Sequence, residues 1–192
     1  MKKLPSLLAL LVGVAAALPA HAAVPASTSP SGTPDYIAAA FGGYDFDKDG
    51  NRDSVDYRLE YQWGASLVPM MNHDWGSLDR WFQLHPVAGF EGNGNGMTYF
   101  NGGLNLDVPV VSNLIFTWGE TVGWYGHGDD HQTLGSPFEM RSQLELGWKF
   151  DNDMRLSAYI SHLSNVDTGD RNPGAEVLGG YLRVPVGWLA HR

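Results

Sequence analysis

Polar and apolar residues alternate along most of the chain after Asp35, and the segment 138–150 shows this pattern most clearly. Its apolar face holds Phe138, Met140, Leu144, Leu146, Trp148 and Phe150, with Ser142 as the one polar member. Its other face holds Glu139, Arg141, Gln143, Glu145 and Lys149. Because successive side chains of a β-strand point to opposite faces, a period of two predicts a strand with one apolar and one polar face.

About eight segments of this kind follow one another, with no helical period of useful length between them. They span residues 35–46, 53–63, 79–91, 96–108, 113–125, 138–150, 153–164 and 175–188. An even number of strands of about 9–11 residues or slightly more is typical of transmembrane barrels. The sequence therefore predicts an all-β fold, an eight-stranded antiparallel outer-membrane β-barrel. Alternation by itself also fits a soluble periplasmic β protein.

The distribution of aromatic and charged residues favours the barrel. Aromatic residues stand near the predicted strand ends, at Tyr44, Trp63, Tyr99, Trp124, Tyr125, Trp148 and Trp188. The polar faces carry opposite charges that could pair inside a narrow barrel, at Arg58 with Glu60, Arg141 with Glu139, Arg155 and Arg183. One residue departs from the pattern, since Glu120 falls on the apolar face of its strand with Phe116 and Trp118.

The N-terminus has the features of an export signal. Lys2 and Lys3 precede an apolar run and an Ala-His-Ala cleavage motif, so residues 1–22 are predicted to be a signal peptide. Residues 23–34, rich in Ala, Ser, Thr and Pro, are expected to form a flexible leader, and residues 35–192 the barrel domain. Export places the N-terminus in the periplasm. Odd-numbered strands would then run outward, and the localisation would be the bacterial outer membrane.

Composition excludes two further classes of protein. The chain has no Cys, so disulfide bonds do not hold it together. Without Lys2 and Lys3 it has 10 basic and 21 acidic residues, a net charge of −11. Such an acidic chain without a basic run is a poor nucleic-acid binder, because phosphate binding depends on clusters of Lys and Arg.

A candidate catalytic group lies at the adjoining ends of the last two predicted strands. His162 and Ser164 share the apolar, lipid-directed face of strand 153–164, and Glu176 has the corresponding face of strand 175–188. Unpaired polar groups in hydrocarbon cost several kcal/mol each, so their presence needs a reason. A His can take the proton of a Ser hydroxyl while a carboxylate orients the imidazole. The structural alternative is that His162 and Ser164 lie in the hydrated interfacial zone.

Residues 138–185 resemble the outer-membrane lipid A 3-O-deacylase family (PagL-type, the acyloxyacyl hydrolases). The resemblance rests on several spaced motifs, His162-Leu163-Ser164-Asn165, Asn172-Pro173-Gly174, Glu176, Gly147-Trp148-Lys149-Phe150 and Tyr181-Leu182-Arg183-Val184-Pro185. The region 138–185, which holds these motifs, covers about a quarter of the chain, and the N-terminal half matches only in general character.

The resemblance implies an esterase with Ser164 as nucleophile, His162 as general base and Glu176 as orienting acid. It further implies Asn172 as an oxyanion-hole donor and Asn165 as a supporting residue. Met140 stands where the family tends to have Phe, which assigns it to the substrate groove. The implied reaction is hydrolysis of an ester-linked acyl chain, at the 3-O position, from lipid A or lipopolysaccharide of the outer leaflet. No cofactor is expected, and a homodimer is left open.

Two other clusters of polar residues carry side chains that can bind metal ions. Asp45, Asp47 and Asp49, followed by Gly50, Asp53 and Asp56, fit the spacing of a calcium loop, but the same residues make an acidic hairpin turn. His127, Asp129, Asp130 and His131 carry metal-capable groups in a Gly-rich loop, for which a solvated loop is the favoured interpretation. The chain has no Gly-x-Ser-x-Gly motif, which argues against a soluble α/β-hydrolase.

Two functions of different classes follow from these observations. The first is a lipid-A-directed serine esterase that is embedded in the membrane. The second is a non-enzymatic small barrel, structural or adhesive, that keeps the sequence of the enzyme without its activity. The set of His162, Ser164 and Glu176 favours the esterase, because a purely structural barrel has no reason to keep all three residues facing lipid.

Overall fold

A computed structural model describes residues 32–46, 54–68, 81–128, 134–169 and 171–189. The signal peptide and most of the leader predicted from the sequence lie outside these residues. Eight strands account for most of the described chain: β1 (Tyr36–Tyr44), β2 (Ser54–Gln62), β3 (Gln83–Asn93), β4 (Thr98–Val111), β5 (Leu114–Gly126), β6 (Phe138–Lys149), β7 (Arg155–Ser164) and β8 (Ala175–Pro185).

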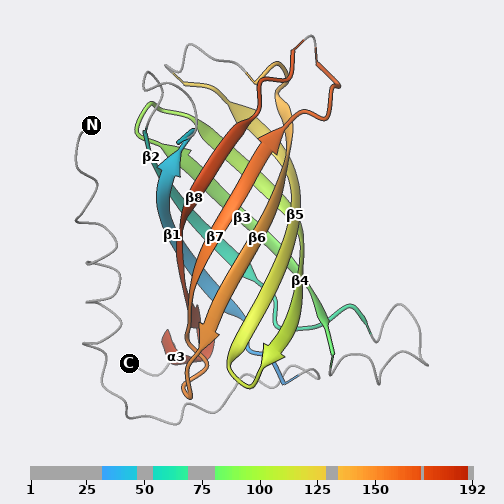
Figure 1. Cartoon of the computed structure of the whole chain (residues 1–192), viewed down its shortest axis with the longest axis vertical. Helices are drawn as coiled ribbons and strands as arrows, with labels where there is room; N and C mark the ends of the chain where they lie inside the picture. Colours follow the sequence, from blue (N-terminus) through green and yellow to red (C-terminus); the bar gives the residue numbers. More distant parts are fainter. Residues whose placement is uncertain (1–31, 47–53, 69–80, 129–133, 170, 190–192) are drawn as a thin grey trace.

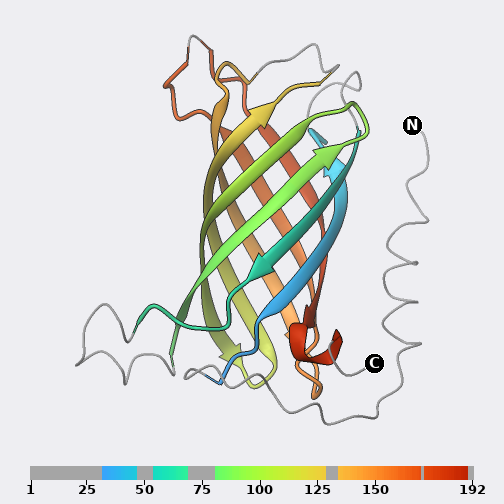
Figure 2. The ribbon, with the colours of Figure 1, turned by 180° about the vertical axis from the view of Figure 1, so that it is seen from behind.

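The strands form one closed antiparallel barrel in which each strand pairs with its neighbours in the sequence and β8 pairs with β1 (Figure 1, Figure 2). The predicted eight-stranded antiparallel β-barrel is therefore confirmed. Closure leaves no strand edge unpaired, which satisfies the backbone polar groups that an open sheet would expose.

The two faces of the strands divide as the sequence pattern predicts. On β6, Phe138, Met140, Leu144, Leu146 and Trp148 are each between 41% and 57% exposed. The alternate residues Glu139, Arg141, Gln143 and Glu145 are at most 3% exposed and line the interior. An apolar outside around a charged inside is the arrangement of a membrane barrel, whereas a soluble sandwich would bury the apolar face.

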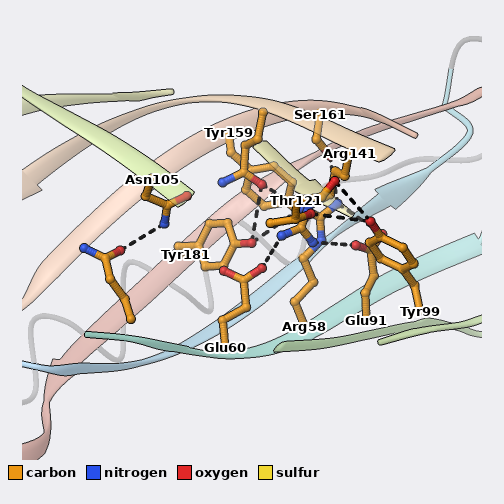
Figure 3. A network of polar contacts seen from close by, with 12 residues as sticks. Arg58, Glu60, Glu91, Tyr99, Asn105, Thr121, Arg141, Tyr159, Ser161 and Tyr181 are labelled. Carbon is orange, nitrogen blue, oxygen red and sulfur yellow. Dashed lines mark hydrogen bonds and ion pairs between the residues drawn. The ribbon is translucent and has the colours of Figure 1, made fainter. Parts of the chain in front are cut away.

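The interior is filled by charged side chains that bond across the barrel (Figure 3). Arg141 bonds Glu60 and also Glu91, the latter at 2.7 Å, while Arg58 donates to Asp56 at 2.9 Å. Closer to the other end, Arg183 pairs with Glu145 at 2.6 Å and Arg155 with Asp107 at 2.9 Å.

The expectation of interior ion pairs is thus confirmed, but several partners differ from those the sequence indicated. Arg141 bonds Glu60 of β2 and Glu91 of β3 instead of Glu139 on its own strand. The guanidinium reaches across the lumen because a barrel of eight strands is narrow enough for opposite walls to touch through long side chains.

The last predicted strand ends earlier than the pattern indicated. β8 stops at Pro185, and residues Val186–Leu189 form the short helix α3. Pro185 pairs with Tyr36, the first residue of β1, and the pairing ends with one further bond, from the Val186 N–H to the Asp35 carbonyl oxygen at 2.8 Å. Proline also lacks the N–H that would continue the ladder. Trp188 therefore lies in α3, beyond the end of the sheet.

Candidate functional site

The candidate site lies on the outside of the barrel, at the end where β7 finishes and β8 begins, which is the upper end in Figure 1. Ile160 and His162 are exposed on the outer face of β7, and Ser164 lies on the same face. The intervening residues Ser161 and Leu163 are buried in the interior. The face predicted for His162 and Ser164 is therefore the one they occupy, directed toward lipid.

His162 and Glu176 are direct cross-strand neighbours in the pairing of β7 with β8. His162 Nδ1 lies 2.9 Å from Glu176 Oε1, and the two side chains are 50% and 26% exposed. A neutral imidazole that donates from Nδ1 to the carboxylate leaves Nε2 as the ring nitrogen that can accept a proton. This geometry is that of a general base oriented by an acid.

Ser164 stands two residues beyond His162 at the end of β7. Its Oγ accepts a hydrogen bond from the Val166 N–H at 3.4 Å. Among the described residues, no hydrogen bond joins the Ser164 hydroxyl to His162. Hydrogen bonds between nucleophile and base are often long in the absence of substrate and tighten when it binds.

Hydrogen bonds from the Asn165 side chain fix the loop after β7. This side chain is 2% exposed, and its Nδ2 donates to the carbonyl oxygens of Leu134 at 2.7 Å and Arg171 at 2.6 Å. Both amide hydrogens are therefore used to join two loops at the upper end of the barrel. This geometry suits a supporting residue and leaves Asn165 without a hydrogen to give to an oxyanion.

Asn172 is exposed and lies beside the same loop. Its Oδ1 accepts from the Asn165 backbone N–H at 3.2 Å, and its Nδ2 donates to Asp167 Oδ1 at 3.1 Å. An amide nitrogen carries two hydrogens, and the bond to Asp167 uses one of them. Asn172 can therefore offer a hydrogen to an oxyanion while the rest of its side chain is fixed.

Gly174 brings the backbone of the loop against the imidazole. Its φ is +62°, and a Cβ built at this position would lie 2.6 Å from His162 Cε1. A side chain here would force the ring to move, so glycine permits the close approach that packs the start of β8 against His162.

Met140 of β6 pairs in register with Ser164, and its side chain is 41% exposed on the outer face. The residue assigned to the substrate groove therefore neighbours the candidate nucleophile. Its assignment to a substrate groove stays a prediction.

Only part of the predicted calcium loop lies within the described residues. Asp45 is 1% exposed, and Asp47 and Asp49 lie outside the described residues. Asp56, the last position of the pattern, points into the barrel and accepts from Arg58 and from Tyr159 at 3.0 Å. Its carboxylate therefore accepts hydrogen bonds inside the barrel.

The second metal candidate is also incompletely described, because Asp129, Asp130 and His131 lie outside the described residues. His127 is exposed, with Nδ1 3.0 Å from the carbonyl oxygen of Gly128. Across residues 32–46, 54–68, 81–128, 134–169 and 171–189, no three His, Asp or Glu side chains gather as a metal site. No helix within those same ranges is long and apolar enough to cross a membrane.

The structure also brings Ser142 and Glu120 into the neighbourhood of His162, which sequence reasoning did not recognise. Ser142 is the cross-strand neighbour of His162, and Glu120 is the neighbour of Ser142. The signal was present in the pattern, since both residues interrupt otherwise apolar faces. Strand alternation alone does not predict that Ser142 and Glu120 lie next to each other.

The closed eight-stranded barrel with its apolar outer wall defines the class of protein, a transmembrane β-barrel of the outer-membrane type, and His162, Ser164 and Glu176 lie on the outer face of this wall. The sequence profile of the family described as lipid A 3-O-deacylase (PagL) matches residues 35–185. The chain belongs to this family, whose members are lipid A deacylases.

Solved structures agree with the fold. The crystal structure of the outer membrane enzyme PagL superposes with a TM-score of 0.62 at 18% sequence identity, covering 79% of this chain and 99% of that chain. A de novo designed transmembrane β-barrel gives a TM-score of 0.50 at 10% identity, covering 79% and 96% of the two chains. No curated protein sequence gives a significant match.

Proposed function

We propose that this barrel is a serine esterase that removes the 3-O-linked acyl chain of lipid A in the outer leaflet. Ser164 is the nucleophile, His162 the general base, Glu176 the orienting acid and Asn172 the oxyanion donor. The observation that carries the proposal is the 2.9 Å contact between His162 Nδ1 and Glu176 Oε1 on a lipid-facing surface, with Ser164 on the same face.

The chemistry proceeds in two steps. His162 Nε2 takes the proton of the Ser164 hydroxyl as Oγ attacks the ester carbonyl, and Asn172 Nδ2 donates to the oxygen that becomes negative. The tetrahedral intermediate expels the sugar oxygen, which takes the proton back from His162, and an acyl-Ser164 ester remains. Water, deprotonated by His162, then attacks this ester. The fatty acid is released, and Ser164 Oγ takes the proton back from His162 as it leaves.

The location of the site explains why these residues face lipid. An acyl ester of a membrane lipid lies at the boundary between its polar head and its hydrocarbon chains. A site near the end of β7, toward the upper end of the apolar wall, would match this level. With the N-terminus in the periplasm, the end at which β7 finishes faces the outer leaflet.

Lipid A mass after expression in an outer-membrane host tests the proposal. Wild type is expected to remove one acyl chain, and fragmentation of the product should locate the loss at the 3-O position. Ser164→Ala is expected to leave lipid A intact. Ser161→Ala is the matched control, because Ser161 lies on the same strand with its Oγ 2.9 Å from Arg58 Nη2 in the interior.

The outcomes separate the parts of the proposal. Full deacylation by folded Ser164→Ala would reject Ser164 as the nucleophile. Loss of an acyl chain from another position would reject the 3-O assignment and leave the triad standing. An intact lipid A with folded wild type in the outer membrane would favour the non-enzymatic barrel.

A further inference from the structure

A row of polar side chains crosses the outer wall of the barrel at the level of His162. Glu120 of β5 pairs with Ser142 of β6, Ser142 pairs with His162 of β7, and His162 pairs with Glu176 of β8. These four residues, here called the polar row, occupy one cross-strand line. Half of the row is the acid and base of the proposed triad, and the other half has no assigned role.

The polar row interrupts a wall that is otherwise apolar. The line immediately below it consists of Trp118, Leu144, Ile160 and Leu178, which are each between 45% and 51% exposed. Above it, Val122 and Met140 are 53% and 41% exposed beside Ser164. A carboxylate on such a surface is costly unless something with polar groups lies against it.

Contacts with Ser142 of the row and with Trp118 of the line below it fix the Glu120 carboxylate. Ser142 Oγ donates to Glu120 Oε2 at 2.8 Å, and Trp118 Nε1 donates to Glu120 Oε1 at 2.7 Å. Both donors are neutral, whereas the interior carboxylates Glu60, Glu91 and Glu145 face guanidinium groups. Glu120 is therefore a preorganised acceptor on the lipid side, held by two neutral donors.

We propose that Glu120 and Ser142 form a substrate-binding subsite that accepts hydrogen bonds from hydroxyl or amide N–H groups next to the scissile ester. The inference rests on the proposed function and names the substrate feature that the same site selects. The Ser142 hydroxyl gives its hydrogen to Glu120, so both residues turn acceptor oxygens toward an incoming molecule. An acylated sugar lipid carries such donors beside its esters, whereas a simple fatty ester does not.

The spacing fits this role. Neighbouring strands lie about 4.8 Å apart, so the backbone of Glu120 is roughly 10 Å from that of His162. This distance separates Glu120 from the reacting atoms and places it beside a neighbouring part of the same substrate. Apolar lines above and below the row leave surfaces for acyl chains on both sides of the polar head.

The experiment compares two substrates with purified, folded protein in detergent micelles. One substrate is lipid A, and the other is a p-nitrophenyl fatty ester that has no hydrogen-bond donor. Glu120→Leu and Ser142→Ala are expected to lower kcat/KM for lipid A, for Glu120→Leu by about tenfold or more, as loss of a charged hydrogen bond implies. Hydrolysis of the p-nitrophenyl ester should stay within about twofold of wild type, as the absence of a donor implies.

The matched control is Tyr57→Leu, which removes another polar group from the outer face, on β2, where Tyr57 is 40% exposed. This variant should hydrolyse both substrates like wild type. Equal loss on both substrates for Glu120→Leu would overturn the proposal, because Glu120 would then act on the catalytic groups. No loss on lipid A would overturn it as well.

Binding separates this inference from the proposed function. Lipid A binding to Ser164→Ala can be followed through tryptophan fluorescence, since Trp118 touches Glu120. Weaker binding by Ser164→Ala/Glu120→Leu than by Ser164→Ala would support the subsite even if wild type proved inactive as an esterase. Equal binding by the two variants would overturn the subsite while a working triad remained in place.

Discussion

Polar side chains occupy two regions of this barrel, the interior and one line on its outer wall, and the two regions satisfy them differently. Inside, Arg141 lies between Glu60 and Glu91, so opposite charges neutralise one another across the lumen. Outside, His162 and Glu176 contact each other while the imidazole remains half exposed. The interior ion pairs are enclosed by the barrel wall, whereas the outer groups keep a side open to the membrane.

The enclosed contacts stabilise the fold, whereas the contacts on the outer wall hold groups that a substrate can reach. A charge that is enclosed by partners contributes to a fixed structure and is not available to a substrate. A base that is held on one side and open on the other can take up and return a proton. The two regions should therefore respond in opposite ways to the same kind of substitution.

The largest expected effect comes from Glu176→Gln, compared with Glu91→Gln. Glu176→Gln should lower kcat on lipid A by as much as about 10⁴-fold, because an amide neither fixes the imidazole tautomer nor stabilises its charged form. Its resistance to urea should match wild type. Glu91→Gln should lower resistance to urea while the folded fraction stays active. Assays of fatty-acid release measure kcat, and urea titrations measure stability, for both variants. Loss of stability in Glu176→Gln together with loss of kcat in Glu91→Gln would refute the comparison.

Breaking the interior network should cost stability. Arg141→Met leaves Glu60 without its guanidinium partner and removes one of the two from Glu91, which should lower the free energy of unfolding by about 3–5 kcal/mol. Urea unfolding in lipid vesicles measures this change. Arg141→Met/Glu60→Gln should recover part of the loss, since it removes one unpaired charge. A loss below about 1 kcal/mol for the single variant would contradict the assigned role.

Asn172→Ala should lower kcat by about 10²–10³-fold with little change in KM, as expected for an oxyanion donor. Asp167→Ala is the control, because it removes the 3.1 Å contact of Asn172 but keeps the amide donor. Its kcat should fall only a few-fold, roughly the effect of one exposed hydrogen bond. Steady-state kinetics on lipid A compare the two variants. Equal losses would assign Asn172 a role in loop structure alone.

The smallest expected effect is that of Met140→Phe on acyl-chain preference. Met140 neighbours Ser164 without taking part in the proposed proton transfers, so a swap between two apolar side chains should change kcat/KM by about tenfold at most. The change should differ among esters of different chain length. A uniform change across the series would mean that Met140 acts on the nucleophile.

The strands and their faces could be predicted from the sequence because alternation is a local property. The apolar face of β6 and the outward direction of His162 and Ser164 both follow from a period of two. The end of β8 could not be predicted this way. It depends on where β1 begins, and Tyr36 is far from Pro185 in the sequence.

Part of the candidate site could be predicted from the sequence. His162, Ser164 and Glu176 stood out because polar residues interrupted an apolar face near two strand ends. Glu120 also stood out as an interruption, but its proximity to Ser142 depends on the register between β5 and β6. The bonds of Asn165 to Leu134 and Arg171 join loops that alternation does not describe.

The sequence by itself determined which side of each strand faces lipid, since side-chain direction is fixed by the position of a residue in an alternating run. Tertiary structure alone decided which residues of neighbouring strands share one line around the wall. Register depends on hydrogen bonding between strands, and a shift of two residues would preserve every face while separating His162 from Glu176 and Ser142 from Glu120. The polar row exists because the closed barrel aligns four strands in one register.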